Sequence, residues 1–209
     1  MPFTVDQFFA VFAAYNEAVW PMQWVLHGTA AAVIALTLST TPNRHRWIAV
    51  LLSFLWAWSG LAYHLLHFSS INPAAYVFGF AFLVQAGLLV WFAVRTVPPK
   101  FSFSRDLRGW LAVALIVYAL AVYPALGAAL GHDYPAAPTF GVPCPTTIFT
   151  LGMLSLARGA GARVLLVVPA LWAVVGGSAA LLLHIPQDIG LIAAGLLVVT
   201  RDLVAARRQ

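Results

Sequence analysis

Two pairs of residues have the types and the spacing of metal ligands. His64 and His67 stand three residues apart near the end of an apolar run, so a helix there would present both on one face. His184 and Asp188 stand four residues apart at the junction of two later apolar runs. Imidazole and carboxylate groups ligate zinc and other transition metals. The sequence therefore predicts that His64, His67, His184 and Asp188 bind one metal ion, with zinc favoured.

Further polar groups could take part in chemistry at such a metal. A zinc-bound water loses its proton easily and can attack an ester or amide bond, with a neighbouring base to accept the proton. His132 and Glu17 are the candidates for this general base. We expect His27, Asp133 and Cys144 to complete the pocket.

Each histidine also has a purely structural interpretation. An imidazole at the end of a membrane helix can bond to water and lipid headgroups, which would account for His67, His132 and His184. The deeper His64 and His27 could be packing groups with satisfied hydrogen bonds. Ionisable groups at membrane depth are costly, however, and mark functional sites. The gathering of five histidines on one side of the membrane therefore favours a site.

Prolines stand on both sides of Cys144, within the stretch Gly131–Thr150. Proline lacks an amide hydrogen and restricts the residue before it, so we expect no regular helix over Val142–Pro145. The chain would then enter the next helix through a broken or re-entrant segment, with Cys144 facing the same pocket as His132. The alternative is a buried cysteine that acts as a small apolar residue.

The composition defines the surroundings of these groups. Of the 209 residues, 62% are apolar and 8% are charged, and the mean hydropathy is +0.90. A soluble domain carries about a quarter charged residues, so a water-soluble globule and a disordered chain are both excluded. The basic residues lie in short gaps between apolar runs, which argues against nucleic-acid binding despite the formal charge of +5. The sequence therefore predicts an all-α integral membrane protein.

The apolar runs predict how often the chain crosses the bilayer. A crossing helix needs about 20 apolar residues. A single membrane domain over residues 1–209 would contain seven such helices, near residues 21–41, 47–67, 74–95, 109–130, 140–157, 163–184 and 186–203. Residues 4–20 set aromatic against polar residues, which predicts an amphipathic helix on the membrane surface. No basic leader precedes this helix, so we expect it in the mature protein.

The basic residues predict the orientation. All 11 Lys and Arg fall in alternate connections, at residues 44–46, 95–108, 158–163 and 201–208. The positive-inside rule makes this side cytoplasmic, with the N-terminus outside and the C-terminus inside. All the histidines except His45 fall on the outer side. Insertion explains the bias of Lys and Arg, but it does not explain the bias of the histidines.

An internal repeat is a further hypothesis. The stretch WAWSGLAYHLLHFSSIN from Trp56 is similar to WAVVGGSAALLLHIPQD from Trp172, and GLLVW at 87–91 is similar to GLLVV at 195–199. These similarities predict that helices one to three and five to seven are parallel copies joined by helix four, a 3+1+3 plan. His67 and His184 would then face each other across a pseudo-twofold axis. The alternative is a chance match between small and apolar residues.

Two resemblances rest on these motifs. The run 132–150, with YP at 134–135, FG at 140–141 and PCPTT at 143–147, resembles a signature of an uncharacterised family of bacterial multi-spanning membrane proteins. This resemblance extends to NEAVWP at 16–21 and implies a bacterial inner-membrane location, without an activity. Ser59 with His64, and His184 with Asp188, are similar to motifs of seven-helix zinc hydrolases, which include alkaline ceramidases and progestin/adiponectin-type receptors.

Three functions fit these observations. The first is a metal-dependent hydrolase acting at the outer leaflet. The second is a small transporter, since a 3+1+3 plan is also that of SWEET-type sugar permeases. The third is a haem- or quinone-binding membrane protein. The inner half offers only non-ionisable polar groups, so a one-sided site fits an enzyme or a haem or quinone site better than a conduit. The expected partner is the lipid bilayer, while the substrate and the oligomeric state are not specified by the sequence.

Overall fold

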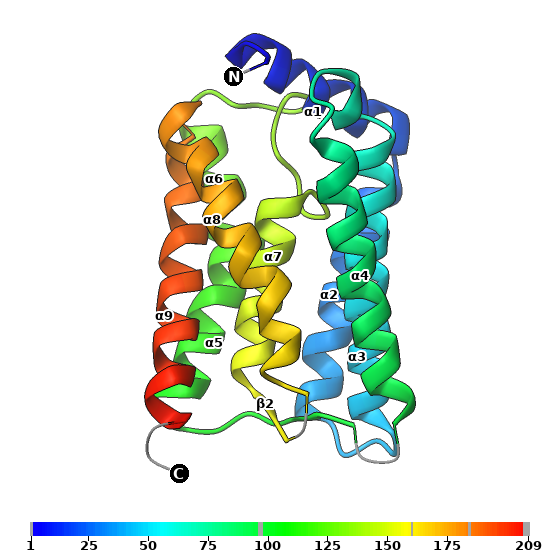
Figure 1. The fold of residues 1–209 in the computed structure, drawn as a ribbon, viewed down its shortest axis with the longest axis vertical. Coiled ribbons are helices and arrows are strands. Elements are labelled where there is room, and N and C mark those ends of the chain that lie inside the picture. Colours follow the sequence, from blue (N-terminus) through cyan, green and yellow to red (C-terminus); the bar gives the residue numbers. More distant parts are fainter. Residues whose placement is uncertain (1, 96–97, 160, 184, 207–209) are drawn as a thin grey trace.

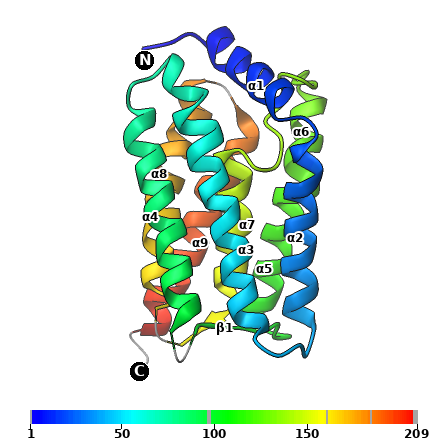
Figure 2. The same cartoon turned by 90° about the vertical axis from the view of Figure 1, so that its right-hand side faces the viewer.

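The computed structural model describes residues 2–95, 98–159, 161–183 and 185–206. These residues form a bundle of helices that run up and down, with one helix lying across its end (Figures 1 and 2). Within the described ranges, strands occur only as the short antiparallel pair β1 (Lys100–Phe101) and β2 (Ala157–Arg158). The prediction of an all-α fold is therefore confirmed.

The helix across the end is α1 (Val5–Val19). Thr4 begins it with a capping box, in which the Thr4 hydroxyl accepts from the Gln7 amide and the Gln7 side chain accepts from the Thr4 amide. The axes of α1 and α2 (Met22–Leu38) differ in direction by 86°, so α1 forms a roof over the bundle (Figure 2). A helix in this segment is confirmed, and Asn16, one of its polar residues, is fully buried.

Helical segments of the bundle occupy each of the predicted spans. In chain order they are α2; α3 (Arg44–Trp58) with the π-helical η1 (Ser59–Leu65) and the 3-10 turn η2 (Phe68–Ser70); α4 (Ala75–Val94); α5 (Leu107–Val117) with the π-helical η3 (Tyr118–Val122) and α6 (Tyr123–Ala129); α7 (Pro143–Ser155); η4 (Val164–Leu166) with α8 (Val167–Leu182); and η5 (Pro186–Asp188) with α9 (Ile189–Ala206). Within the described ranges, three helices are long and apolar enough to cross a membrane, or four if the bent α1–α2 pair is one span. These helices fit a membrane protein.

The centre of the bundle is α7, in which every residue except Cys144 is buried. Its 13 residues rise only about 20 Å, less than the thickness of a bilayer core. The irregular stretch before it folds down beneath α1 to reach its start (Figure 1). The expected broken entry is therefore correct. The expectation of no helix over Val142–Pro145 is wrong from Pro143 onward, because both prolines stand in the first turn, where no intrahelical amide bond is needed.

The two ends of the bundle differ in charge. The end opposite α1 holds the β1–β2 pair (Figure 1). The described basic residues belong to the strands, connections and helix ends of this end: Arg44, Arg46, Arg95, Lys100, Arg105, Arg108, Arg158, Arg163 and Arg201. At this end the β1 strand is also hydrogen-bonded to α3, since the Phe101 amide donates to His45 Nδ1 over 3.1 Å. The alternation of charge along the sequence therefore becomes a basic end and an α1 end.

Candidate functional site

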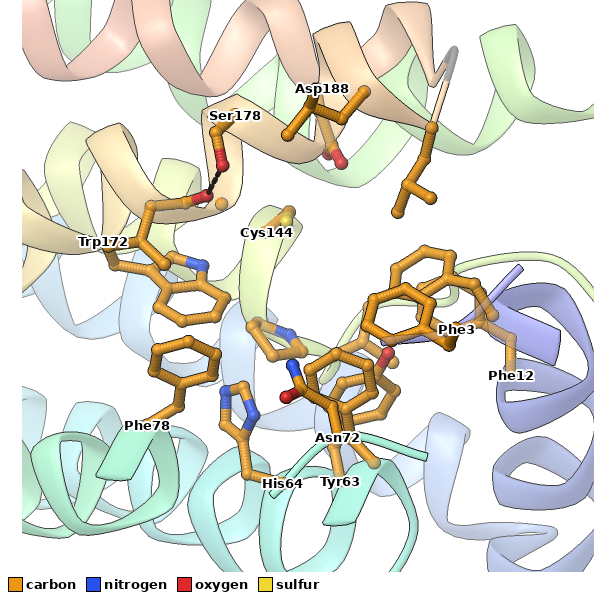
Figure 3. A pocket seen from close by; sticks show the side chains of 18 of the residues that line it. Phe3, Phe12, Tyr63, His64, Asn72, Phe78, Cys144, Trp172, Ser178 and Asp188 are labelled. Atoms are coloured by element: carbon orange, nitrogen blue, oxygen red, sulfur yellow. Dashed lines mark hydrogen bonds between the residues drawn. The ribbon is translucent and has the colours of Figure 1, made fainter. Parts of the chain in front are cut away.

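A cavity of about 240 Å³ lies directly beneath α1. Its walls are mainly apolar, include many aromatic rings and come from both halves of the chain (Figure 3). Phe8 and Phe12 project down from α1, His64 projects from η1, and Trp172 projects from α8. A few polar side chains interrupt this apolar lining, and Figure 3 shows Cys144 and Asp188 across the cavity from His64. The cavity is thus apolar with a small number of placed polar groups, as ligand sites commonly are.

His64 is the most unusual of these polar groups. It is fully buried, and its ring lies 4.8 Å from the Phe82 ring and 5.0 Å from the Trp172 ring, edge to face in both cases. Among the described residues, neither of its ring nitrogens has a hydrogen-bond partner. Leaving a buried polar group unpaired costs about 1–3 kcal/mol. The fold therefore buries an imidazole among aromatic rings and leaves both of its ring nitrogens without a partner in the described part of the chain.

Two π-helical segments border the cavity. His64 and Tyr63 lie in η1, and Tyr123 directly follows η3. A π-helical turn has wider spacing than an α-helical turn and is frequent at functional sites. A Cβ at Gly60, in the first turn of η1, would lie 3.1 Å from the Gly79 carbonyl, so α4 packs closely against this segment. Irregular helix geometry and close packing together direct His64 into the cavity.

The opposite wall carries a carboxyl group in the η5 turn. Asp188 is 2% exposed, and the Tyr123 hydroxyl donates to its Oδ1 over 2.6 Å. The turn itself is fixed by the Tyr118 hydroxyl, which donates to the Gln187 carbonyl over 2.7 Å. The Tyr123 hydroxyl thus occupies one acceptor position of Asp188, and the carboxylate retains capacity to accept a further bond.

Trp172 supplies the third polar group of the lining. The residue is 9% exposed, and its indole Nε1 has no partner among the described residues. The indole N–H can only donate. Sequence reasoning used Trp172 in the repeat comparison and did not assign it a site role. A tryptophan in an apolar helix carries no local signal that its N–H is unpaired, because pairing depends on residues from other helices.

The structure brings together three of the predicted site residues. His64, Cys144 and Asp188 all line the cavity. His67 does not: its Nδ1 donates to the Ala62 carbonyl over 2.6 Å, and its side chain lines a separate cavity between α1 and residues 66–71. His64 and His67 therefore line different cavities, and the metal-ligand role expected of His67 stays a prediction.

The remaining described candidates lie away from the cavity lining. Glu17 and Asp133 are exposed. The His132 ring lies 4.2 Å from the Phe9 ring, on α1. The His27 Nδ1 donates to the Gln23 carbonyl over 2.8 Å within α2. The structure therefore does not place the predicted general bases, His132 and Glu17, at the aromatic cavity.

The predicted metal ligand His184 lies outside the described residues. Over the ranges that the structure describes, no three His, Cys, Asp or Glu side chains gather closely enough to hold a metal ion. A metal site at the cavity would need a donor beyond these ranges. Zinc binding therefore stays a prediction.

Asn16 is a structural residue that sequence reasoning missed. Its side-chain amide donates to the Pro135 carbonyl over 2.6 Å and to the Ala137 carbonyl over 2.7 Å. Its Oδ1 accepts from the Thr139 hydroxyl over 2.7 Å. Through these bonds, Asn16 connects α1, which covers the cavity, to the irregular stretch before α7. The signal in the sequence was an asparagine within the aromatic face of an amphipathic segment.

Comparisons with known proteins define the relationship of the chain. No curated protein and no solved structure matches it. The model of one protein family, described as a family of unknown function (DUF6064), matches residues 5–209. The expectation of an uncharacterised family is thus confirmed, while the resemblance to zinc hydrolases stays a prediction. Because the match covers nearly the whole chain, the protein belongs to the DUF6064 family.

Proposed function

We propose that the protein binds a small, flat, largely apolar molecule with polar ring substituents, such as a quinone ring, in the aromatic cavity beneath α1. The observation that carries this proposal is the buried His64 ring, whose two nitrogens have no partner among the described residues. A ligand with one acceptor and one donor would satisfy both nitrogens, since a neutral imidazole offers one of each.

The other polar groups of the lining support the same ligand class. The Trp172 N–H can donate to a ring carbonyl, and Asp188 can accept from a ring hydroxyl. The rings of Phe78, Phe82 and Trp172 surround His64 edge to face, an arrangement that favours a further aromatic ring among them. The volume of about 240 Å³ suits a single ring better than a large cofactor.

The test is binding of a probe quinone to the purified protein in detergent. Decyl-benzoquinone is titrated, and quenching of the intrinsic tryptophan fluorescence is recorded. We expect saturable quenching that is weakened about tenfold or more in His64→Phe, which keeps a ring and removes both nitrogens. His27→Phe is the matched control, because that histidine lies outside the cavity lining. Equal affinity in the wild type and His64→Phe would refute the proposal.

A metal-dependent hydrolase acting at the outer leaflet is the second candidate. The observation in its favour is that His64, Cys144 and Asp188 line one cavity and are all transition-metal ligands by type. A bound zinc would supply hydroxide to an ester or amide bond. Elemental analysis of the purified protein tests this function. Stoichiometric zinc that is lost in Asp188→Asn would support it, and absence of zinc after reconstitution would exclude it.

For the location we propose a multi-pass bacterial inner-membrane protein with seven spans, in which the α1 end is periplasmic and the basic end cytoplasmic. The segregation of the described basic residues to the end opposite α1 supports this orientation. The 3+1+3 repeat is part of the same proposal.

Single-cysteine labelling in intact cells tests the orientation. In a Cys144→Ser background, Glu17→Cys should react with a membrane-impermeant maleimide. Arg105→Cys should react only after the membrane is permeabilised. The reverse pattern would invert the proposed topology.

A further inference from the structure

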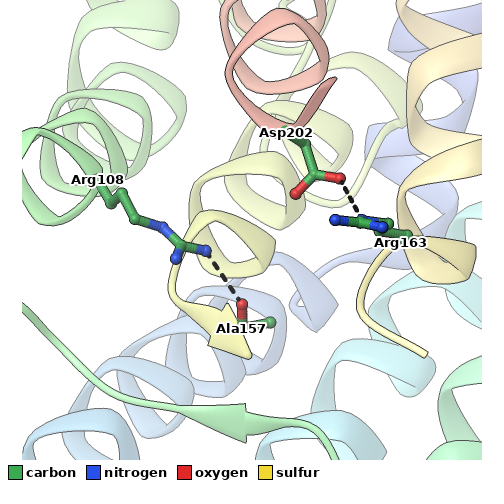
Figure 4. A network of polar contacts seen from close by, with 4 residues as sticks. All are labelled: Arg108, Ala157, Arg163 and Asp202. Carbon is green, nitrogen blue, oxygen red and sulfur yellow. Dashed lines mark hydrogen bonds and ion pairs between the residues drawn. The ribbon is translucent and has the colours of Figure 1, made fainter. Parts of the chain in front are cut away.

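The basic end of the bundle holds a second, open cavity of about 760 Å³. It lies where the start of α5, the strand β2 and the last turns of α9 approach each other (Figure 4). Four arginines and two aspartates line it together with small residues: Arg108, Arg158, Arg163, Arg201, Asp106 and Asp202. This cavity is separate from the aromatic one, so an inference from it does not depend on the proposed function.

Both aspartates of this cavity are already engaged. Asp106 caps α5, and its Oδ1 accepts from the Ser104 hydroxyl over 2.6 Å and from the Gly109 amide over 3.1 Å. Asp202 pairs with Arg163, with 3.3 Å between Oδ2 and Nε (Figure 4). Among the described residues this is the one ion pair within 4 Å. Over the part of the chain that the structure describes, only one of the four arginines therefore has a carboxylate within ion-pair distance.

Within the described ranges, the other three arginines have only long hydrogen bonds to protein acceptors, or none. Arg108 donates to the Ala157 carbonyl and Arg201 to the Ser155 carbonyl, each over 3.4 Å, which is long for such a bond. The second terminal nitrogen of Arg201 is buried without a partner in the described part of the chain. Arg158 stands directly opposite Lys100 in the β1–β2 register. Like charges at directly opposed strand positions destabilise the pair.

We infer that this cavity binds a phosphate group, supplied either by an anionic lipid headgroup or by free inorganic phosphate. A guanidinium presents a planar fork of donors that matches two phosphate oxygens, and several forks around one cavity can share the oxygens of one phosphate. The same anion would offset the repulsion between Arg158 and Lys100. The positive-inside rule accounts for basic residues at this end, but it does not account for their convergence around a cavity or for the burial of an unpaired Arg201 nitrogen.

Binding of two probes by the full-length protein tests the inference. Inorganic phosphate is titrated calorimetrically into protein purified in phosphate-free detergent. In parallel, protein reconstituted in phosphatidylcholine nanodiscs, with or without phosphatidate, is analysed by native mass spectrometry for retained phosphatidate. The double variant Arg108→Gln/Arg201→Gln removes two of the guanidinium groups that line the cavity. Arg44→Gln removes a charge at the same end of the bundle from a residue that does not line the cavity.

We expect at least one probe to bind the wild type and Arg44→Gln alike, and to bind the double variant about tenfold or more weakly. Binding of inorganic phosphate identifies the soluble source, and retention of phosphatidate alone identifies the headgroup. The conservative variant Arg108→Lys/Arg201→Lys keeps the charge and should still lose affinity, which separates the fork from simple charge attraction. Circular dichroism verifies folding, and the single variants replace the double variant if it does not fold. No binding of either probe, or equal binding by all variants, would overturn the inference.

Discussion

The two ends of the bundle hold cavities of opposite character. The cavity beneath α1 is small and rich in aromatic rings, and it contains a buried imidazole that has no partner among the described residues. The cavity at the basic end is larger, open and lined by arginines. In both cavities, some polar atoms have no hydrogen-bond partner among the described residues. The polarity of the surrounding walls determines which class of ligand these atoms favour. Apolar walls make an unpaired group costly and favour a largely apolar ligand, whereas an open cationic cavity favours an anion.

Breaking the roof of the aromatic cavity has the largest expected effect. Asn16→Ala removes the amide that holds the irregular stretch before α7 and leaves the Pro135 and Ala137 carbonyls without this donor. We expect a loss of about 3 kcal/mol of unfolding free energy and a melting temperature about 6–12 °C lower. Glu17→Ala, at the exposed neighbouring position, is the control and should melt like the wild type. Unchanged melting of Asn16→Ala would show that α1 is held by other contacts.

Disturbing the wall that carries Asp188 is expected to have the next largest effect. A Cβ at Gly190 would collide with the Tyr118 ring, which packs against this glycine. Gly190→Ala should therefore displace Tyr118, break its bond to the Gln187 carbonyl and destabilise the protein by about 2 kcal/mol. Thermal unfolding measures this loss. Gly28→Ala, where a Cβ meets no atom within 4 Å, should leave the melting temperature unchanged or raise it slightly.

Replacing the His64 imidazole is expected to raise stability, in contrast to the two variants above. His64→Phe fills the same aromatic cage and removes two unsatisfied polar atoms. We expect the ligand-free protein to gain about 1 kcal/mol in stability, with a melting temperature about 2–4 °C higher, while probe binding is lost. Such a gain is typical of residues kept for function at a cost in stability. A lower melting temperature would indicate that His64 is a satisfied packing group.

At the basic end, the smallest effect is expected from Asp106. The hydrogen bonds from Ser104 and from the Gly109 amide hold the pKa of this carboxyl below its ordinary value. The contribution of Asp106 to stability is therefore full above the unfolded-state pKa of about 4 and is lost as the pH falls through the lower folded-state pKa. Asp106→Ala should lower the melting temperature by at most about 3 °C at neutral pH, with a smaller difference in acid.

The same variant also tests the arginine cavity. Since Asp106 is engaged as a helix cap, Asp106→Ala should bind phosphate or phosphatidate at least as well as the wild type. Weaker binding would show that this carboxylate orients the arginines.

Part of the candidate site could be predicted from types and spacing. The sequence singled out His64, Cys144 and Asp188, and all three line the aromatic cavity. It also grouped His67 with His64, whereas the two side chains line different cavities. Whether a helix is α or π depends on how neighbouring helices pack, and an apolar run does not record this. The sequence also did not indicate that Trp172 lines the cavity, because this too depends on how the helices pack.

The sequence by itself determined which segments are helical and which end of the bundle is basic. Apolar run length and the placement of Lys and Arg are local properties, and each can be read without knowing what lies alongside. Only the tertiary structure decided that α1 closes a cavity, that Asn16 is buried rather than exposed, and that α7 begins at the prolines we expected to exclude it. The roof over the cavity and the burial of Asn16 depend on contacts between residues more than a hundred positions apart, such as the bond from Asn16 to the Ala137 carbonyl, and the partners of such contacts cannot be identified from local sequence.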